Sequence, residues 1–422
     1  MFVNMNSGIP WLFGGVVSLL TVVYSLHGSA SELPLIEQIE TEVADVVKQC
    51  GGKVLRDAKT GRIIEVDVAA TRSSVDDAVF SVVAQLEGLK KLSVSGGSLS
   101  EGSLKKLEKL VSMEELCLLD TVTSDADLAA LCGKMPKLKR LTLRRLAKLS
   151  NQGLEPLRRL KELRNLSLLS LSINGAGLET VTALSSLRAL DLRGCNELKA
   201  EDYRLLATMT SLTDLKIGGA AIDADVLRTV AALPNLTGLA VEDASVSAAI
   251  WDELFALPQW SENMSSLAFA RMYSVSDQVL EKLSGFKKLR TLSLRAVPVR
   301  GTFVEHLAPD SRLFDTLQTL GMTKNYATPD EILSLNRFRN LKKLDFSNTP
   351  MTLEKIEALS TLEQMETLIL MECQLTDTML EKLVSLKNLS VLNAGGNPSL
   401  TEQSRETVKQ FPKLTSDNAT FY

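Results

Sequence analysis

The sequence predicts an α/β solenoid, in which about fourteen short units of one strand and one helix stack along a single axis. The stretch Met365–Thr376 has the pattern L-x-x-L-x-L-x-x-C-x-L-[ST], which places Leu368 and Leu370 as the inward residues of a short buried strand. A helical apolar pattern follows at Leu380–Leu386, and Leu389 then begins the same pattern again. The third observation is that this cycle recurs along most of the chain, which is typical of repeat architectures.

Each unit begins at an apolar residue, and the spacing of these residues is nearly constant. The intervals are 24 to 26 residues, except for two of 28 residues, from Leu236 to Met264 and from Leu289 to Leu317. Such a period favours one continuous repeat domain over two or three separate domains. The unit starts are Ile63, Leu89, Met113, Leu138, Leu163, Leu187, Leu212, Leu236, Met264, Leu289, Leu317, Leu341, Met365 and Leu389.

The eighth residue after each start is predicted to lie in the turn that follows the strand. In seven units its side chain is short and polar or carries a thiol, so it can bond to the backbone of the neighbouring unit. Other units have Gly, Ala, Leu or Val there, so we expect an incomplete ladder of such bonds. We interpret Cys195 and Cys373 as core thiols at this position and not as metal ligands. The seven residues are Thr71, Thr121, Cys195, Asn325, Thr349, Cys373 and Asn397.

Helix starts are also marked in the sequence. Four hydroxyl residues stand where an N-cap is needed, and Thr328–Glu331 reads as a capping box with Pro at the first helical position. Apolar residues three apart then follow on one helical face, as at Leu154, Leu157 and Leu160. Each helix can therefore bury its apolar face only against neighbouring units. The four hydroxyl residues are Ser100, Ser124, Thr352 and Thr376.

These units resemble those of the leucine-rich repeat proteins, of the longer, helix-containing kind typified by ribonuclease inhibitor. The resemblance covers about Ile63–Leu414. It implies a right-handed α/β horseshoe with a parallel sheet on the concave side and helices on the convex side. It also implies protein–protein recognition as the usual activity, with no shared catalytic residues.

The ends of the chain differ in kind from the repeats. Residues 1–30 are predicted to be a cleaved secretory signal peptide, because Ile9–Leu26 is apolar and leads into a run of small residues. The alternative is an uncleaved N-terminal anchor, since the usual basic residues are missing before this apolar stretch. We expect a capping helix and connector at 31–61, the repeat domain at 62–414 and a C-terminal tail at 415–422.

The composition limits the classes of partner and the cellular locations that the sequence predicts. A net charge of −4 and an aromatic content of 5% give no reason to expect nucleic-acid binding. The five cysteines are dispersed, so the clustered cysteine caps of many extracellular leucine-rich repeat proteins are missing. This pattern resembles the bacterial envelope members of the family. We therefore expect a secreted or periplasmic protein that contacts a membrane only through an uncleaved N-terminal segment.

The sequence offers little that would support catalysis. His27 would be lost with the signal peptide, leaving His306 as the only histidine, and no phosphate-binding glycine motif or C-x-x-C motif is present. We expect no enzyme activity, no cofactor, no metal site and no catalytic residue.

The outward side chains of the strands are the candidate binding residues. Alternation along a strand directs the second, fourth and sixth residues after each start to the concave face. There we expect a protein or peptide partner to contact charged residues in the middle units and apolar residues near the C-terminus. The candidates are Arg140, Arg144, Asp191, Arg193, Asp214, Lys216, Ile369 and Met371.

The sequence thus predicts a non-enzymatic protein-binding leucine-rich repeat protein of the cell envelope or exterior. Two alternatives remain open: a membrane-tethered architectural component of the envelope, and an accessory domain of an enzyme complex. The two long units insert residues near Trp251 and Trp260, which we expect to seal an enlarged core and not to anchor a partner.

Overall fold

The structure is a computed structural model, and it describes residues 32–69, 75–96, 100 and 102–421. The predicted signal peptide or anchor at 1–30 lies outside the described residues, as does Thr71. Among the described residues, no helix combines the length and the apolar character that crossing a bilayer requires.

Sixteen strands form one sheet in which the spatial order is the chain order. The strands are β1 (Lys53–Arg56), β2 (Ile63–Val68), β3 (Lys91–Ser95), β4 (Glu115–Leu119), β5 (Arg140–Arg144), β6 (Asn165–Leu169), β7 (Ala189–Asp191), β8 (Asp214–Gly218), β9 (Gly238–Glu242), β10 (Ser266–Ala270), β11 (Thr291–Arg295), β12 (Thr319–Thr323), β13 (Lys343–Asp345), β14 (Thr367–Ile369), β15 (Val391–Asn393) and β16 (Ala419–Thr420).

One or two helical segments lie between successive strands from β2 to β16, and α1 precedes the sheet. The α-helices are α1 (Glu32–Gln49), α2 (Asp77–Val83), α3 (Asp125–Lys134), α4 (Gly175–Thr182), α5 (Ala224–Ala231), α6 (Ala248–Phe255), α7 (Pro258–Asn263), α8 (Asp277–Leu280), α9 (Phe303–His306), α10 (Leu313–Thr316), α11 (Pro329–Ser334), α12 (Leu353–Leu359), α13 (Asp377–Lys382) and α14 (Gln403–Val408). The 3₁₀ helices are η1 (Ser103–Lys109), η2 (Gln152–Arg159), η3 (Asp202–Thr208), η4 (Glu281–Gly285), η5 (Leu335–Arg337), η6 (Leu383–Ser385) and η7 (Ser416–Asn418).

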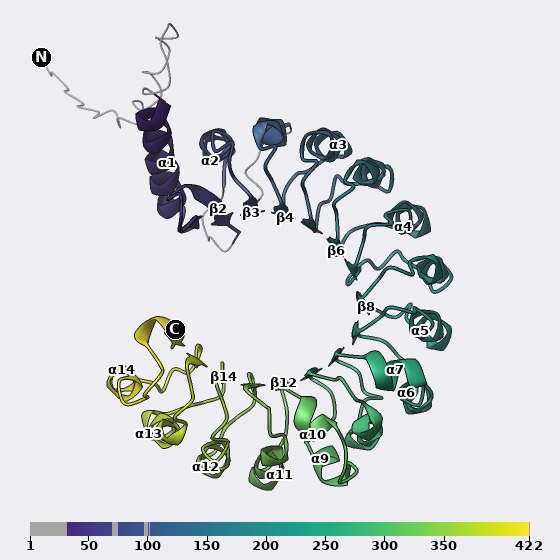
Figure 1. Cartoon of the computed structure of the whole chain (residues 1–422), viewed down its shortest axis with the longest axis vertical. Helices are drawn as coiled ribbons and strands as arrows, with labels where there is room; N and C mark the ends of the chain where they lie inside the picture. The colour runs from purple at the N-terminus through teal and green to yellow at the C-terminus, as the bar shows by residue number, and fades with distance from the viewer. Residues whose placement is uncertain (1–31, 70–74, 97–99, 101, 422) are drawn as a thin grey trace, which may run out of the picture.

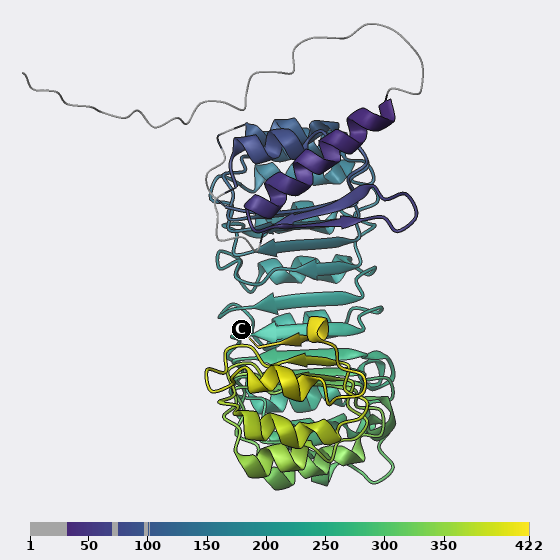
Figure 2. The same cartoon turned by 90° about the vertical axis from the view of Figure 1, so that its left-hand side faces the viewer.

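The chain curves into an open ring with the sheet on its inner side and the helices on its outer side (Figure 1). From β2 to β16 every strand pair is parallel, and equivalent residues of successive units face each other, as at Leu267 and Leu292. The predicted curved α/β solenoid is therefore confirmed. The strands run across the inner wall, and α1 lies obliquely over its N-terminal end (Figure 2).

The stacking of units depends on the residue seven positions after the unit start, in the turn that follows the strand. In nine units this residue is not glycine, yet it has a left-handed backbone with φ between 49° and 59°. Its N–H donates to the carbonyl of the next unit, as from Asp120 to Arg144 at 2.8 Å and from Lys324 to Ser347 at 3.0 Å. The strained conformation thus extends the hydrogen-bond ladder beyond the strands.

The turn residue that follows points inward, and its bonds to the neighbouring unit form an incomplete ladder, as the sequence predicts. Asn397 is buried, donates to the Leu370 carbonyl at 2.8 Å and accepts from the N–H groups of Cys373 at 2.8 Å and Leu375 at 3.0 Å. The thiol of Cys195 donates to the Leu168 carbonyl at 3.1 Å in the same way. Burial raises the pKa of the Cys195 and Cys373 thiols to about 11, so both are core thiols, as predicted.

A second set of bonds between units was not predicted. Asp277, at the start of α8, accepts from the N–H groups of Arg300 at 2.8 Å, Gly301 at 2.9 Å and Phe303 at 3.0 Å in the following unit. Asp77, Asp125 and Asp377 bind the next unit from equivalent places. Hydrogen bonds from Ser100 and Ser103 lower the pKa of Asp77 to about 2.

Most predicted helix starts agree with the structure. Ser124 and Thr328 form capping boxes with Asp127 and Glu331, and the hydroxyls of Thr352 and Thr376 each accept one backbone N–H. The prediction for Ser100 is wrong, because the N-cap of η1 is Gly102 in a left-handed conformation. The Ser100 hydroxyl instead bonds to Asp77 of the preceding unit.

The ends of the sheet contain strands that were not predicted. β1 lies in the expected connector and pairs antiparallel with β2. β16 lies in the expected tail and pairs parallel with β15, so these residues extend the sheet. In α1 the buried carboxylate of Glu40 forms ion pairs with Arg56 at 2.7 Å and Arg62 at 2.9 Å, which ties the helix to the first hairpin.

The two long units enlarge the core on the helical side. Trp251 and Trp260 are 0% and 2% exposed, and Trp251 packs edge-on against Phe269 with ring centroids 4.9 Å apart. Phe255 contacts both tryptophans and Phe286. The expectation that the tryptophans seal this core is confirmed.

Replacing Asn397 tests the turn ladder. Asn397→Ala leaves two buried N–H groups and a buried carbonyl without their partner, and we expect a loss of ~3 kcal/mol in unfolding free energy. Urea unfolding with hydrogen exchange should localise the loss to the units around β14 and β15. Asn336→Ala removes one exposed side-chain bond to Thr361 and should cost less than ~0.5 kcal/mol. Equal losses in both variants would contradict the ladder.

Candidate functional site

The concave face presents three columns of side chains, as the alternation predicts. In β5, Leu141 and Leu143 are buried, whereas Arg140, Thr142 and Arg144 alternate with them on the opposite, more exposed face of the sheet. The same burial pattern recurs in β6 and β10. Because the strands pair in register, equivalent side chains of neighbouring units lie next to each other.

The first column consists of the residues two positions after each unit start. At the N-terminal end of the sheet, charges of opposite sign alternate along this column. Lys91 lies between Glu65 at 2.9 Å and Glu115 at 3.7 Å, and Arg140 reaches Glu115 at 2.7 Å. The hydrogen bond to Glu65 raises the pKa of Lys91. Arg140, the last member and a predicted site residue, keeps 61% of its side chain exposed.

Arg144 lies at the other end of the same strand and is held by Asp120, at 2.9 Å. Asp120 also accepts from Arg145, and the pKa of its carboxyl is lowered, first by Arg145 and then by Arg144. One carboxylate thus fixes two guanidinium groups, so this point carries a net positive charge.

Arg193 is oriented by Asp191 two residues earlier. Its Nε and Nη2 donate to the two carboxylate oxygens at 2.9 Å and 2.7 Å, and this bond raises the pKa of Arg193. Asp191 was predicted to contact a partner, but only 6% of it is exposed. Both oxygens of the Asp191 carboxylate are therefore bonded to Arg193.

Three arginines converge on Glu242 at the end of β9. Glu242 Oε2 lies 3.7 Å from Arg193, 3.4 Å from Arg271 and 3.4 Å from Arg295. Arg271 also pairs with Asp243, which lowers the pKa of that carboxyl. Sequence reasoning missed Arg271 and Arg295. Arg295 is a sixth-position residue and could have been found, whereas Arg271 lies in the turn after β10, with a left-handed backbone, outside the alternation of the strand.

Asp214 and Lys216 meet Asp191 at a small hollow of about 110 Å³, lined also by Asn165, Ser167 and Ala189. A hollow of this size suits the tip of one polar side chain or a few waters. The structure therefore brings four of the predicted residues, Asp191, Arg193, Asp214 and Lys216, onto the neighbouring strands β7 and β8 and the turn after β7.

Beyond β8 the concave face becomes a shallow floor of small side chains. A Cβ on Gly238 would lie 2.2 Å from Asp214, and one on Gly218 would lie 2.5 Å from Glu242, so both glycines make room for a neighbouring carboxylate. Glycine and alanine on a sheet let another backbone approach closely. The floor residues are Gly238, Ala240, Ser266, Ala268, Ser293 and Gly321.

Ile369 and Met371 lie apart from this centre. They belong to β14 and the turn after it, where Thr367 of the same strand pairs with Val391 of β15. Met371 and Val391 are each 38% exposed. The predicted residues therefore form separate groups at β5, at β7–β8 and at β14, and one small ligand cannot span them.

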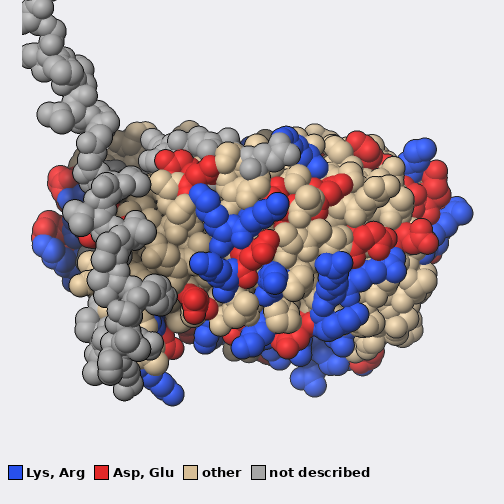
Figure 3. All heavy atoms as spheres, turned by 90° about the horizontal axis from the view of Figure 1, so that it is seen from above, with Lys and Arg blue, Asp and Glu red and all other residues tan. Residues whose placement is uncertain are grey.

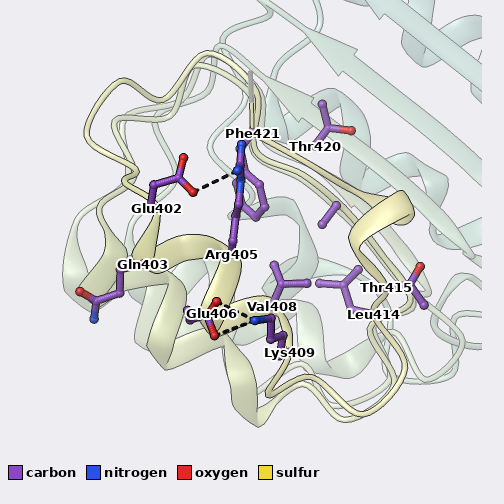
Figure 4. A pocket seen from close by; sticks show the side chains of 11 residues that line it. Glu402, Gln403, Arg405, Glu406, Val408, Lys409, Leu414, Thr415, Thr420 and Phe421 are labelled. Atoms are coloured by element: carbon purple, nitrogen blue, oxygen red, sulfur yellow. Dashed lines mark hydrogen bonds and ion pairs between the residues drawn. The ribbon is translucent and has the colours of Figure 1, made fainter.

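A hollow of about 1100 Å³ lies at the C-terminal end of the sheet and not on the concave face. Figure 4 shows Val408, Leu414 and Phe421 at its apolar side, with ion pairs from Arg405 to Glu402 and from Lys409 to Glu406 along α14. Such a hollow follows from stacking geometry, since an end unit has no neighbour to cover its core edge.

Charges of both signs are mixed over the outer surface as well. Figure 3, the view from above, shows acidic and basic side chains side by side and no broad area of one sign on the visible face. Among the described residues no group of three or more His, Cys, Asp or Glu side chains could hold a metal ion. The site thus consists of paired charges beside a small-residue floor.

The repeat geometry decides the fold: one parallel strand per unit, an inward turn residue bonded to the neighbouring unit, and helices outside. The chain has the leucine-rich repeat fold. No protein-family model matches it, and the comparison with curated proteins finds no match. Among solved structures, a yeast complex of Rad7 and Elc1 matches 92% of this chain and 93% of that chain, with 14% identity and a TM-score of 0.55.

Two further solved structures also match this leucine-rich repeat chain. A leucine-rich repeat protein of Leptospira interrogans has 21% identity and a TM-score of 0.38 over 81% of this chain and 80% of that one. A TLR13–ssRNA13 complex has 16% identity and a TM-score of 0.45, over 81% of this chain and 60% of that chain.

A matched pair of glycine variants tests the geometry of the floor. In Gly218→Ala the new Cβ meets the Glu242 backbone oxygen at 2.8 Å as well as its side chain, so the backbone must shift. We expect a loss of ~1–3 kcal/mol in unfolding free energy. In Gly238→Ala only the Asp214 side chain must move, and we expect less than ~0.5 kcal/mol. Similar melting temperatures for the two variants would contradict this account.

Proposed function

We propose that this chain is a non-enzymatic binding protein whose concave sheet receives a protein or an extended peptide. The observation that carries the proposal is the floor of small side chains from β9 to β12, bordered by Arg193, Arg271 and Arg295. A partner backbone can lie close to Ala240 and Ala268, which are partly exposed, while its polar groups reach the guanidinium groups at the border.

The charges around the floor favour a protein over a polyanion. Arg193 and Arg271 have carboxylate partners at short distance, and Arg295 shares Glu242 with them. A nucleic-acid surface needs basic side chains that are free to neutralise a row of phosphates. Paired charges instead hold side chains in fixed positions, which supports specific recognition.

The size of the face is consistent with this role. Sheet spacing of ~4.8 Å per strand gives the face an arc of roughly 60–70 Å. A standard protein interface needs about 800 Å² on each partner, and the strands from β5 to β12 can supply it.

Blocking the floor tests the proposal. Ala240 and Ala268 face each other on β9 and β10, and both are partly exposed. We expect Ala240→Arg with Ala268→Arg to abolish retention of a partner recovered by affinity purification, because two long charged side chains would fill the floor. The melting temperature should stay within a few degrees of the wild type.

The matched control places the same substitutions on the convex side of adjoining units. Ala232 and Ala256 are the exposed C-cap residues of α5 and α6. Ala232→Arg with Ala256→Arg should retain the partner at wild-type levels. If the convex pair loses the partner and the concave pair keeps it, the helical face is the binding surface.

We propose further that the protein works in the periplasm or outside the cell. The support is the apolar stretch Ile9–Leu26 followed by small residues. Fractionation with amino-terminal sequencing should find a mature chain that begins near Ser31 in a soluble fraction. An intact N-terminus in the membrane fraction would instead support the tethered architectural role.

A further inference from the structure

A row of exposed tyrosine and proline side chains lies on the rim of the ring, outside the concave face. Tyr273 and Tyr326 are 88% and 77% exposed, the highest values among the large apolar side chains exposed in the described chain. Both stand nine residues after a unit start, in the turn between a strand and the next helix. The equivalent residues of the units that follow them are Pro298 and Pro350, and both are exposed. We call these four residues the rim row.

The turn holds each member of the rim row in one orientation. Before Tyr273, Arg271 has φ of 53° and Met272 is buried, with its sulfur accepting the Ala244 N–H at 3.2 Å. After it, the Ser274 hydroxyl accepts from Trp251 Nε1 at 3.1 Å. The residues on both sides of the tyrosine are thus anchored inward, and the ring between them has to point outward.

The turn that carries Tyr326 has the same construction. Lys324 has φ of 54°, and Asn325 is buried and bonds to the Val299 carbonyl of the preceding unit. The N–H of Ala327 donates to the Asn325 side chain at 2.6 Å, and Thr328 then caps α11. Rigid turns of this kind present an aromatic ring without an ordering cost on binding, and tyrosine is a common interface anchor.

The spacing of the two tyrosines matches one ligand conformation. β10, β11 and β12 pair in register, so Tyr273 and Tyr326 are two strand spacings apart, roughly 10 Å. A polyproline II helix repeats every three residues and rises ~3.1 Å per residue, which gives ~9.3 Å per turn. Prolines at positions i and i+3 of such a segment can therefore each pack on one tyrosine, with Pro298 beneath the residues between them.

The positive charge of Lys324 beside Tyr326 favours a partner segment that carries an acidic residue. Lys324, Tyr326, Asn348 and Pro350 line a hollow of about 350 Å³, together with Asn325 and Glu372. Among the described residues no carboxylate lies within ion-pair distance of the exposed Lys324 ammonium group, whereas Arg271 beside Tyr273 pairs with Asp243. An acidic side chain next to the proline on Tyr326 would supply the missing partner.

We propose that the rim row is a second binding surface, which takes an extended proline-containing segment of a partner protein in the polyproline II conformation, with prolines three residues apart and an acidic residue beside one of them. This surface is separate from the concave floor and does not depend on the function proposed for it.

Fluorescence anisotropy with synthetic peptides tests the rim row on the full chain. The probe is a labelled peptide with prolines at every third position and one glutamate. We expect micromolar binding, weakened ~10-fold or more by Tyr273→Ser or Tyr326→Ser and lost in the double variant. Leu333→Ser, which removes an exposed apolar side chain from α11, should leave the Kd unchanged. Both tyrosines are exposed, so melting temperatures should not change.

Control peptides decide the chemistry of the ligand. Replacing the prolines with alanine, or moving them to every fourth position, should weaken binding ~10-fold. Lys324→Gln should weaken the glutamate peptide ~3-fold and leave a glutamine peptide unaffected. Absence of binding to the wild type, insensitivity to the tyrosine variants, or equal binding of the alanine peptide overturns the proposal.

The concave variant separates this site from the proposed function. Ala240→Arg with Ala268→Arg should bind the proline peptide as the wild type does. Loss of peptide binding in that variant would place the peptide on the floor and overturn the rim proposal, while the concave proposal would stand.

Discussion

The structure depends on how each unit passes its backbone hydrogen bonds to the next. A parallel sheet leaves the residues that follow its strands without partners unless the turn continues the ladder. Here a residue in the turn after the strand adopts a left-handed conformation, and its N–H donates to a carbonyl at the end of the next unit's strand, as from Arg145 to Leu169 at 3.0 Å and from Asp243 to Ala270 at 3.1 Å. The cost of this conformation in a non-glycine residue is of order 1 kcal/mol, and the buried turn residue that follows holds it in place.

That constraint explains which parts of the fold were predictable. Core positions such as Leu368 and Leu370 repeat at fixed spacing, and the inward turn residues Asn397 and Cys373 carry side chains suited to bonding a neighbouring backbone. The left-handed positions cannot be recognised in the sequence, because they are occupied by Asp, Arg, Ser, Ala, Lys, Asn and Glu, which share no side-chain chemistry. Their common feature is a backbone angle that only the stacked structure imposes.

The same reasoning explains which residues of the candidate site the sequence predicts and which it misses. Period-two alternation places Arg140, Lys216 and Met371 on the concave face from sequence alone. It cannot show that Asp191 lies beneath Arg193, because that depends on the length and orientation of a guanidinium group two residues away. Nor can it show that Arg271 turns toward Glu242, since Arg271 follows the strand and leaves its alternation. The unpredicted strands β1 and β16 are short and pair at the ends of the sheet, where the repeat pattern itself stops.

A rigid repeat also decides where recognition can occur. Strand residues alternate and inward turn residues are committed to bonding, so the side chains left free are the concave columns and the outward residue between two anchored turn positions. On the concave columns most charges are already paired, which leaves the small floor as the part that a partner can approach. On the rim, Tyr273 and Tyr326 are free because their neighbours Met272 and Asn325 are buried. Both surfaces therefore follow from the repeat: alternation along the strands exposes the concave columns, and the turn fixes the residues on either side of each tyrosine and leaves the tyrosine between them free.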